Sequence, residues 1–463
     1  MVPRRGLPWP VIATVCLGTF MGAIDVSIVT VAYPTFTAAF HVPVSLVQWT
    51  SVVYLLTSAT LVAIVGRVSD MVGHKRIYVA GFAVFLAGSV LCGAATGIGA
   101  LIAFRILQAV GSAMLVANSV AILSHTVGAA RMGTALGVME TAVSVALVVG
   151  PVAGGLLIQA FSWRMIFYVN VPVAIGAMLL ARRALPPLEG GRRERFDAAG
   201  AVTFGGGLGT LLLGASLGPI AGWATPGVDA LLAAGVVLLA AFFGIERRVR
   251  PPMLDLALFQ NRAFAGACAA KLCAYAGSFT ISFVIPFYLQ RLLRYPPGAV
   301  GVAMMPMPAA LAAGSLLGGP LSDRAGSHVL APLGMAVAAA GGYLFTRVSP
   351  AHGYAALAAA MVVLDFGLGL FIAPNDAVIM NSAPADKQGV AGGVLAMMRN
   401  VGMITGLTLA ATIVQGQLGA AGGGRPALTH GIHDVYVATI ALCVLGTALS
   451  LLRGRAGRNG SSV

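Results

Sequence analysis

The chain has 463 residues, of which 58% are hydrophobic and only 9% are charged, with a mean hydropathy of +0.92. A soluble globular domain carries about 25% charged residues, so the composition excludes a soluble enzyme and indicates a protein that lies in lipid. The net charge of +14 does not indicate nucleic-acid binding, because the basic residues lie in short turns and form no basic face. The five cysteines lie in apolar stretches without CxxC or His-paired spacing, so neither a metal site nor a cofactor is expected.

Apolar runs long enough to cross a bilayer occur fourteen times, since a spanning helix needs about 20 mostly apolar residues. The predicted spans are 10–34, 45–65, 77–96, 99–123, 133–159, 166–184, 198–218, 228–246, 264–289, 299–321, 329–347, 354–377, 389–415 and 433–452. The first run follows Arg4 and Arg5, but it is too long for a signal peptide and is expected to remain as the first span.

The basic residues predict the orientation of these spans. Most of the 28 Lys and Arg residues fall in the N-terminus, in the tail and in joints on one side of the predicted spans. The positive-inside rule places that side in the cytoplasm, together with both termini. This arrangement requires an even number of spans, which fourteen satisfies.

Two similar turns indicate an internal duplication. Residues 66–76 read GRVSDMVGHKR, and a shorter echo at 319–326 reads GPLSDRAG. The positions that align at one offset of 253 residues (319 minus 66) are Gly66, Asp70 and Gly73 in the first turn and Gly319, Asp323 and Gly326 in the second. The turns follow the second and the tenth span, so the repeat crosses eight spans. We therefore expect a six-helix bundle over 1–187, two inserted helices over 188–255, and a second six-helix bundle over 256–463.

Three further segments carry a family resemblance. They are IDVSIVTVAYP at 24–34, LIAFRILQAVG at 101–111 and GPVAGG at 150–155. Together with the turn at 66–76, they resemble the major facilitator superfamily, specifically its fourteen-span drug:proton antiporters. The resemblance covers nearly the whole chain and implies an all-α integral membrane protein with the major facilitator fold.

The resemblance implies structural roles for the motif residues. In the first turn, Asp70 would cap or pair with a neighbouring helix end, while Lys75 and Arg76 hold the cytoplasmic face. In the 150–155 segment, the small residues allow helices to approach closely, and proline favours a kink at an external gate. The residues of that segment that carry this antiporter signature are Gly150, Pro151, Gly154 and Gly155.

Five ionisable residues lie well inside the predicted spans, namely Asp25, Arg105, Glu140, Lys271 and Asp365. Exposing all five to lipid would cost on the order of 12 to 18 kcal/mol, so they must face one another or a wet cavity. From a rise of 1.5 Å per residue, Asp25 and Arg105 lie about 24 and 21 Å from the cytoplasmic edge. We expect these two to pair in the outer half of the membrane, and Glu140, Lys271 and Asp365 to form a second, inner cluster.

The family fold implies roles for these charges. In that fold the first and fourth helix of each half line the central cavity, and Asp25, Arg105, Lys271 and Asp365 occupy these four spans, one apiece. Asp25 is the first candidate to carry a proton, with Glu140 or Asp365 as the second, while Arg105 acts electrostatically. The competing interpretation is that these charges form static buried pairs that only stabilise helix packing.

The substrate side is less specific. Phe283 and Met305 are among the aromatic and methionine side chains that offer adaptable apolar contacts in a cavity. The alternative is that they pack against lipid or a neighbouring helix. No P-loop is present, which disfavours ATP-driven pumping.

The resemblance implies an exporter in the cell membrane that exchanges protons for a small amphipathic drug or antibiotic and acts as a monomer. Two other functions remain open. One is a proton-coupled importer or exporter of a metabolite on the same fold, and the other is a non-transporting membrane sensor.

Overall fold

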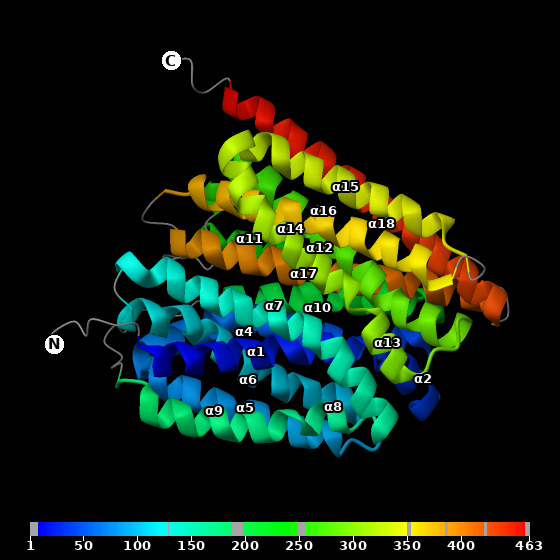
Figure 1. Cartoon of the computed structure of the whole chain (residues 1–463), viewed down its shortest axis with the longest axis horizontal. Coiled ribbons are helices and arrows are strands. Elements are labelled where there is room, and N and C mark those ends of the chain that lie inside the picture. The colour runs from blue at the N-terminus through cyan, green and yellow to red at the C-terminus, as the bar shows by residue number, and fades with distance from the viewer. Residues whose placement is uncertain are drawn as a thin grey trace. The chain divides into compact units, whose positions relative to one another are not determined.

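The computed structural model describes residues 8–127, 129–187, 198–248, 256–349, 353–384, 388–420 and 424–458, and the regular elements in these ranges are helices (Figure 1). The chain divides into two compact units. Unit 1 comprises Met1–Val42, Trp49–Ala201 and Pro297–Val302, and unit 2 comprises Pro43–Gln48, Val202–Pro296 and Ala303–Val463.

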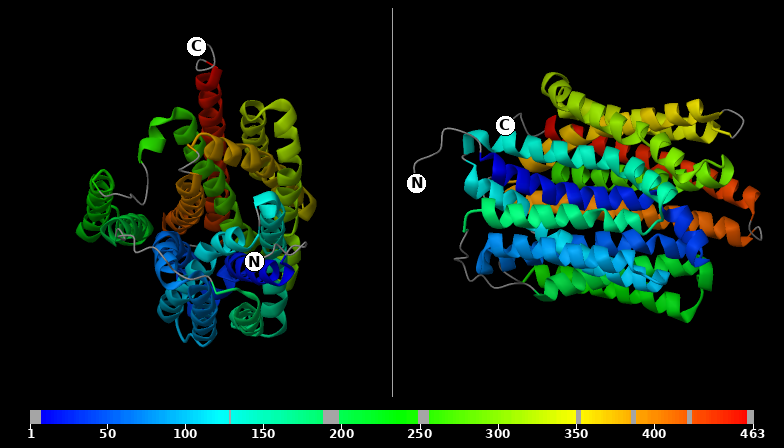
Figure 2. Two further views of the ribbon diagram at one scale, coloured as in Figure 1. Left: turned by 90° about the vertical axis from the view of Figure 1, so that its left-hand side faces the viewer. Right: turned by 60° about the horizontal axis from the view of Figure 1, so that its bottom comes forward.

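Unit 1 contains the N-terminal helices. They are α1 (Trp9–Thr30), α2 (Tyr33–Phe40), α4 (Trp49–Val72), α5 (His74–Gly93), α6 (Ile98–Thr126), α7 (Ala129–Ala160), α8 (Met165–Tyr168) and α9 (Asn170–Ala184), with the start of α13 (Pro297–Ala303). Helix α1 packs mainly against α7, and α6 packs against α4 and α5. The long helices of this unit run side by side (Figure 2).

Unit 2 contains the remaining helices. They are α3 (Val44–Val47), α11 (Pro226–Glu246), η1 (Leu256–Gln260), α12 (Arg262–Phe287), the π-helical turn η2 (Tyr288–Leu292), α14 (Pro306–Ala325), α15 (Ser327–Arg347), α16 (Gly353–Asn381), α17 (Gln388–Ala420) and α18 (Arg425–Arg458). Most of α10 (Ala198–Ala221) also belongs here. Helix α12 lies at the centre, because it packs against α16, α17 and α18.

Thirteen helices among the described residues are long and apolar enough to cross a membrane. The remaining predicted span, 198–218, coincides with α10, where the described apolar stretch is the shorter Val202–Ala215. The inserted helix α11 is mostly open to its surroundings, whereas most of α12 is buried. The chain is therefore an all-α, multi-pass membrane protein, as the sequence predicted, and α11 contributes few side chains, Phe242 among them, to the core of unit 2.

Prolines interrupt two segments that the sequence predicted as single spans. The predicted span 10–34 ends as α1 at Thr30, and α2 begins at Tyr33. Pro34 has no amide hydrogen for a helical bond to the carbonyl four residues earlier. Pro306 acts in the same way between α13 and α14. Each interruption is thus a local consequence of a proline.

The predicted duplication is confirmed by the conformation of the two turns. Gly73 precedes α5 with φ of 108°, and Gly326 precedes α15 with φ of 84°, a region that favours glycine. In each turn the glycine amide donates to the carbonyl of the serine four residues earlier, Ser69 or Ser322, at 2.8 Å. The two copies of the motif therefore form the same backbone turn.

The helices after these turns repeat the same close contacts. A Cβ added to certain glycines of the pairs α5/α6 and α15/α16 would collide with the neighbouring helix in each unit. They are Gly81, Gly88 and Gly111 in unit 1 and Gly334, Gly341 and Gly367 in unit 2. The glycines of α5 and α15 keep the offset of 253 residues, so the duplication extends from the turn into the packed helices.

Candidate functional site

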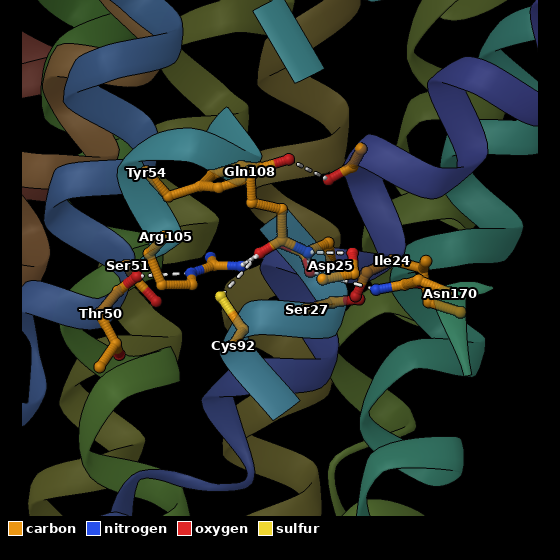
Figure 3. Close-up of polar contacts among 12 residues, drawn as sticks. Ile24, Asp25, Ser27, Thr50, Ser51, Tyr54, Cys92, Arg105, Gln108 and Asn170 are labelled. Atoms are coloured by element: carbon orange, nitrogen blue, oxygen red, sulfur yellow. Dashed lines mark hydrogen bonds and ion pairs between the residues drawn. The ribbon is translucent and has the colours of Figure 1, made fainter. Parts of the chain in front are cut away.

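The centre of unit 1 holds a buried ion pair between α1 and α6. The side chains of Asp25 and Arg105 are both 0% exposed, and Arg105 Nη1 donates to Asp25 Oδ2 (Figure 3). Asp25 lies about 24 Å along α1 from Trp9, and Arg105 lies about 10 Å into α6 from Ile98, at 1.5 Å per residue. The two helices run in opposite directions, so the charges meet at one depth. The predicted pairing of these residues is confirmed.

Other groups hold the guanidinium of Arg105 in place. Its Nε donates to the Thr50 carbonyl of α4 at 2.8 Å, and its Cζ lies 4.2 Å from the centroid of the Tyr54 ring. A cation over an aromatic face is stabilised by the ring quadrupole. Nη2 of Arg105 is buried and has no hydrogen-bond partner among the described residues. Helix α4 therefore fixes the arginine while one donor stays available.

Two amides complete the surroundings of the carboxylate. Gln108 Nε2 donates to Asp25 Oδ1 at 2.7 Å and to Ser89 Oγ of α5 at 2.9 Å, while Gln108 Oε1 accepts from Arg105 Nη1 at 2.7 Å. Asn170 Nδ2 of α9 donates to Asp25 Oδ1 at 3.4 Å. Gln108 thus bridges both partners of the ion pair, and five helices of unit 1 meet at this site (Figure 3).

Protonation of Asp25 would change this arrangement. The carboxylate is neutralised by one cation and held by amide donors, so its ionised form is stable in the membrane. If Asp25 takes up a proton, its attraction for Arg105 weakens and the guanidinium must find another acceptor. Protonation of one oxygen atom would therefore change the contacts between α1, α4 and α6.

The predicted inner cluster is wrong in its partners. Lys271 of α12 donates through Nζ to Asp376 Oδ1 of α16 at 2.6 Å, rather than to Asp365. Asp376 lies eleven residues beyond Asp365, which is about 16 Å along a helix, and α16 extends to Asn381. The sequence placed the span end at 377, so Asp376 was not counted among the buried charges. The side chain of Glu140 lies outside the described residues.

Asp365 occupies an isolated position in unit 2. It is 2% exposed, and its Oδ2 has no hydrogen-bond partner among the described residues. Its helix, α16, packs closely against α14 and α15. A buried carboxylate with an unpartnered oxygen is costly in its ionised form, so the surroundings of Asp365 differ from those of Asp25.

The segment at 150–155 forms close helix contacts within unit 1. A Cβ on Gly150 would lie 1.9 Å from Ser27 Oγ of α1, and one on Gly154 would lie 2.8 Å from backbone and side-chain atoms of Ile28. Ser27 Oγ also donates to the Ala146 carbonyl of α7 at 3.2 Å. The small residues therefore bring α7 against α1, as expected for this motif.

The other two residues of that motif lie against α13. A Cβ on Gly155 would meet the Pro297 carbonyl oxygen at 2.3 Å, and a Cβ on Gly301 would meet that of Pro151 at 2.2 Å. Side chains larger than hydrogen at these positions would force the helices apart.

The turn residues lie at the start of α5. Lys75 Nζ donates to the Leu185 carbonyl just after α9, whereas Arg76 is exposed. The side chains of Asp70 and Asp323 lie outside the described residues. Lys75 therefore joins the ends of two helices of unit 1.

The two predicted substrate contacts differ in accessibility. Phe283 is fully buried, with its ring centroid 5.5 Å from that of Phe287. Met305 is 38% exposed between α13 and α14. Of the pair, only Met305 presents much surface in this conformation.

The chain matches a known protein family over most of its length. The model of the Major Facilitator Superfamily matches residues 15–407, which is most of the chain. The chain belongs to the major facilitator superfamily. It is therefore a membrane transporter rather than an enzyme.

Curated relatives of this transporter are named for different transported compounds. It is 32% identical over 405 residues to the riboflavin transporter RibZ of Clostridioides difficile (strain 630), with 86% of each chain covered. It is 29% identical to the tetracenomycin C resistance and export protein of Streptomyces glaucescens, over 90% of this chain and 77% of that one. It is 33% identical to a multidrug resistance protein B homologue of Mycobacterium tuberculosis (strain ATCC 25618 / H37Rv), over 80% and 70% of the two chains.

Solved transporters share the fold. A bacterial homologue of the human lysosomal transporter Spinster, inward-facing and unoccupied, matches with a TM-score of 0.70 at 16% identity, covering 98% of both chains. A variant of the peptide transporter POT matches with a TM-score of 0.72 at 15% identity, covering 98% of this chain and 97% of that one. At these identities the similarity concerns the fold alone, and it confirms the predicted major facilitator fold.

Sequence reasoning missed four polar residues around the buried charges. Gln108 and Asn170 bind Asp25, and Asp376 binds Lys271. Arg399 lies inside α17, close enough to act electrostatically on Lys271 and Asp376. Gln108 lies one helical turn after Arg105, which was a usable signal. Asp376 lies one residue before the end of the predicted span 354–377, whereas Arg399 lies ten residues inside the predicted span 389–415 and was overlooked among the buried charges.

Proposed function

We propose that this transporter is a fourteen-span drug:proton antiporter that exports a small amphipathic drug or antibiotic. The observation that carries the proposal is the fully buried Asp25–Arg105 pair, which Gln108 and Asn170 surround with amide donors. Ionisable side chains inside a membrane are rare and commonly belong to ion or proton pathways. The relatives named for tetracenomycin C export and multidrug resistance support the direction and the cargo.

In this proposal Asp25 carries the proton and Arg105 responds to it. Glu140 and Asp365 are second candidates for proton coupling, and Lys271 and Asp365 contribute to the substrate cavity with Phe283 and Met305. A proton entering from outside neutralises Asp25, which frees Arg105 and favours the conformation that releases substrate. Each proton that crosses contributes about 2.3 kcal/mol per 100 mV, which supports a roughly 50-fold substrate gradient.

The remaining motifs would serve the conformational change. The glycines and proline of the 150–155 segment allow α7 to move against its neighbours. The two turns, with Gly66, Asp70, Lys75 and Asp323, brace the cytoplasmic ends. The proposed bundles at 1–187 and 256–463 alternate between inward-open and outward-open states by rocking, with 188–255 as the inserted pair. The basic joints support a position in the cell membrane with both termini in the cytoplasm, and we expect a monomer.

Proton release from everted membrane vesicles tests this function. Vesicles acidified by respiration and reporting through a pH-sensitive dye receive a panel of amphipathic antibiotics and drugs. An antiporter releases protons when its substrate is added. Asp25→Asn is expected to abolish this release, whereas Asp229→Asn, at an exposed position in the first turn of α11, is the matched control. Full substrate-linked release by Asp25→Asn would contradict the proton site, and efflux that survives an uncoupler would contradict antiport.

A metabolite transporter on the same fold is the second candidate. The observation that favours it is the 32% identity to a riboflavin transporter over most of both chains. Radiolabelled riboflavin offered to the same vesicles separates the two. Accumulation of riboflavin without any response to the antibiotic panel would favour the metabolite function.

A further inference from the structure

Three charged side chains lie together in unit 2, one on each of three neighbouring helices. Lys271 of α12 bonds to Asp376 of α16 at 2.6 Å, and the two side chains are 2% and 27% exposed. A Cβ on Gly402, one helical turn after Arg399 in α17, would lie 2.7 Å from the Leu272 carbonyl oxygen. Arg399 therefore lies near Lys271, within electrostatic reach of both charges. Helix α12 packs against α16 and α17, so the three charges form one cluster, which we name the Lys271 cluster.

The Lys271 cluster has more positive than negative charge. It contains two cations and one carboxylate, and the described groups that act on Lys271 and Asp376 include no second carboxylate. Nε of Arg399 is buried without a hydrogen-bond partner among the described residues. An uncompensated cation inside the membrane is unfavourable. Binding of an anion, rather than of a further cation, would therefore balance the charge of the cluster.

An apolar layer lies next to the Lys271 cluster. One helical turn away along α12, α16 and α17 lie Cys268, Ile379 and Leu395, all part of one hydrophobic cluster. Phe204 of α10 and Phe242 of α11 belong to the same layer. A compound bound here would place a charged group against the cations and an apolar part beside this layer.

The Lys271 cluster is not completely buried. The Asp376 side chain is 27% exposed, and both Arg399 and Tyr275 are of intermediate burial. Lys271 Nζ lies 5.6 Å from the centroid of the Tyr275 ring. A ligand that reached the exposed part of Asp376 would meet the carboxylate that holds Lys271.

We propose that Lys271 and Arg399 bind an anionic group, a carboxylate or a phosphate, on the transported compound. Asp376 holds Lys271 while the site is empty and competes with the anion for it. The inference rests on the proposed function in taking the bound compound to be cargo. By this inference the transported compound is an amphipathic anion that binds in unit 2, whereas the Asp25–Arg105 pair of unit 1 handles the proton.

Equilibrium binding of two dyes tests this charge preference without transport. Fluorescein is an anion at pH 7.5, and rhodamine 123 is a cation built on the same xanthene rings. Fluorescence anisotropy reports the binding of each to the full-length protein in phosphatidylcholine nanodiscs. Wild-type protein is expected to bind fluorescein at least about tenfold more tightly, because one added charge-assisted hydrogen bond contributes that much.

Removing a positive charge and removing a negative charge from the cluster are expected to change fluorescein binding in opposite directions. Arg399→Gln is expected to weaken fluorescein binding about tenfold and not to weaken rhodamine binding, while Arg399→Lys retains most of the affinity. Asp376→Asn removes the competing carboxylate and is expected to strengthen fluorescein binding. Arg347→Gln, which removes an exposed arginine of α15 in the same unit, is the matched control and should change neither dye.

The outcomes are decisive in either direction. The proposal is overturned if wild-type protein binds no fluorescein, prefers rhodamine, or loses affinity for both dyes equally in Arg399→Gln. Weaker fluorescein binding in Asp376→Asn would also overturn it. Nanodiscs with phosphatidylglycerol identify the source of the anion, since a lipid headgroup at this site would displace fluorescein from wild type. Loss of proton release with intact dye preference would contradict only the proposed antiport.

Discussion

The substitution Gln108→Leu tests whether Gln108 stabilises the Asp25–Arg105 ion pair through hydrogen bonds or only fills space beside it. Gln108 bonds to Arg105 and to Asp25, each at 2.7 Å, with both partners buried. Hydrogen bonds to charged groups contribute about 1.5 to 3 kcal/mol each, so losing both costs about 3 to 6 kcal/mol. Leucine has a similar volume and recovers about 1 kcal/mol through apolar burial. The expected net loss, about 2 to 5 kcal/mol, is a large fraction of a typical folding free energy of 5 to 15 kcal/mol.

Thermal unfolding of the purified transporter in detergent measures this loss. The matched control is Gln159→Leu, the same change at an exposed residue of α7 whose side chain accepts one neutral bond from the Gly298 amide at 2.9 Å. Gln108→Leu is expected to melt well below both wild type and Gln159→Leu, and substrate-linked proton release should fall with it. Equal melting temperatures for the two variants would refute the argument that Gln108 stabilises the buried pair.

Three further predictions concern packing and charge. Gly154→Ala places a Cβ about 2.8 Å from the α1 backbone and is expected to destabilise the protein by about 1 to 3 kcal/mol. Gly392→Ala, whose added Cβ would meet nothing within 4 Å, should not destabilise it. Equal melting temperatures for the two variants would contradict the close approach of α7 to α1. Asp376→Asn leaves Lys271 and Arg399 without a carboxylate and should lower the free energy of unfolding by about 3 to 5 kcal/mol. Adding Lys271→Met to this variant should restore most of the lost stability. A double variant no more stable than the single one would argue against the ion pair. Asp365→Leu should raise the melting temperature because it removes a buried carboxylate with an unpartnered oxygen, and a lower temperature would show that this oxygen is satisfied.

Local sequence was sufficient for the features that depend on local chemistry. Apolar run length decides whether a segment can cross lipid, so the predicted spans matched helices, apart from local breaks such as those before Pro34 and Pro306 and the one at Gln48. The aligned glycines required the same turn twice, and Gly73 and Gly326 adopt it. The pairing of Asp25 with Arg105 followed from depth alone, since a fixed rise per residue converts sequence position into height along each helix.

Tertiary structure alone decided which of the side chains at similar heights face one another. Asp365 and Asp376 both lie on α16, but only Asp376 reaches Lys271, because helix rotation and the length of α16 past its predicted end select the partner. Asn170 contacts Asp25 from 145 positions away in the sequence, and no local sequence pattern predicts this contact. The sequence by itself therefore determined the membrane class, the duplication and the first ion pair. The network around that pair, and the excess of positive charge in the Lys271 cluster, exist only because packed helices bring distant residues together.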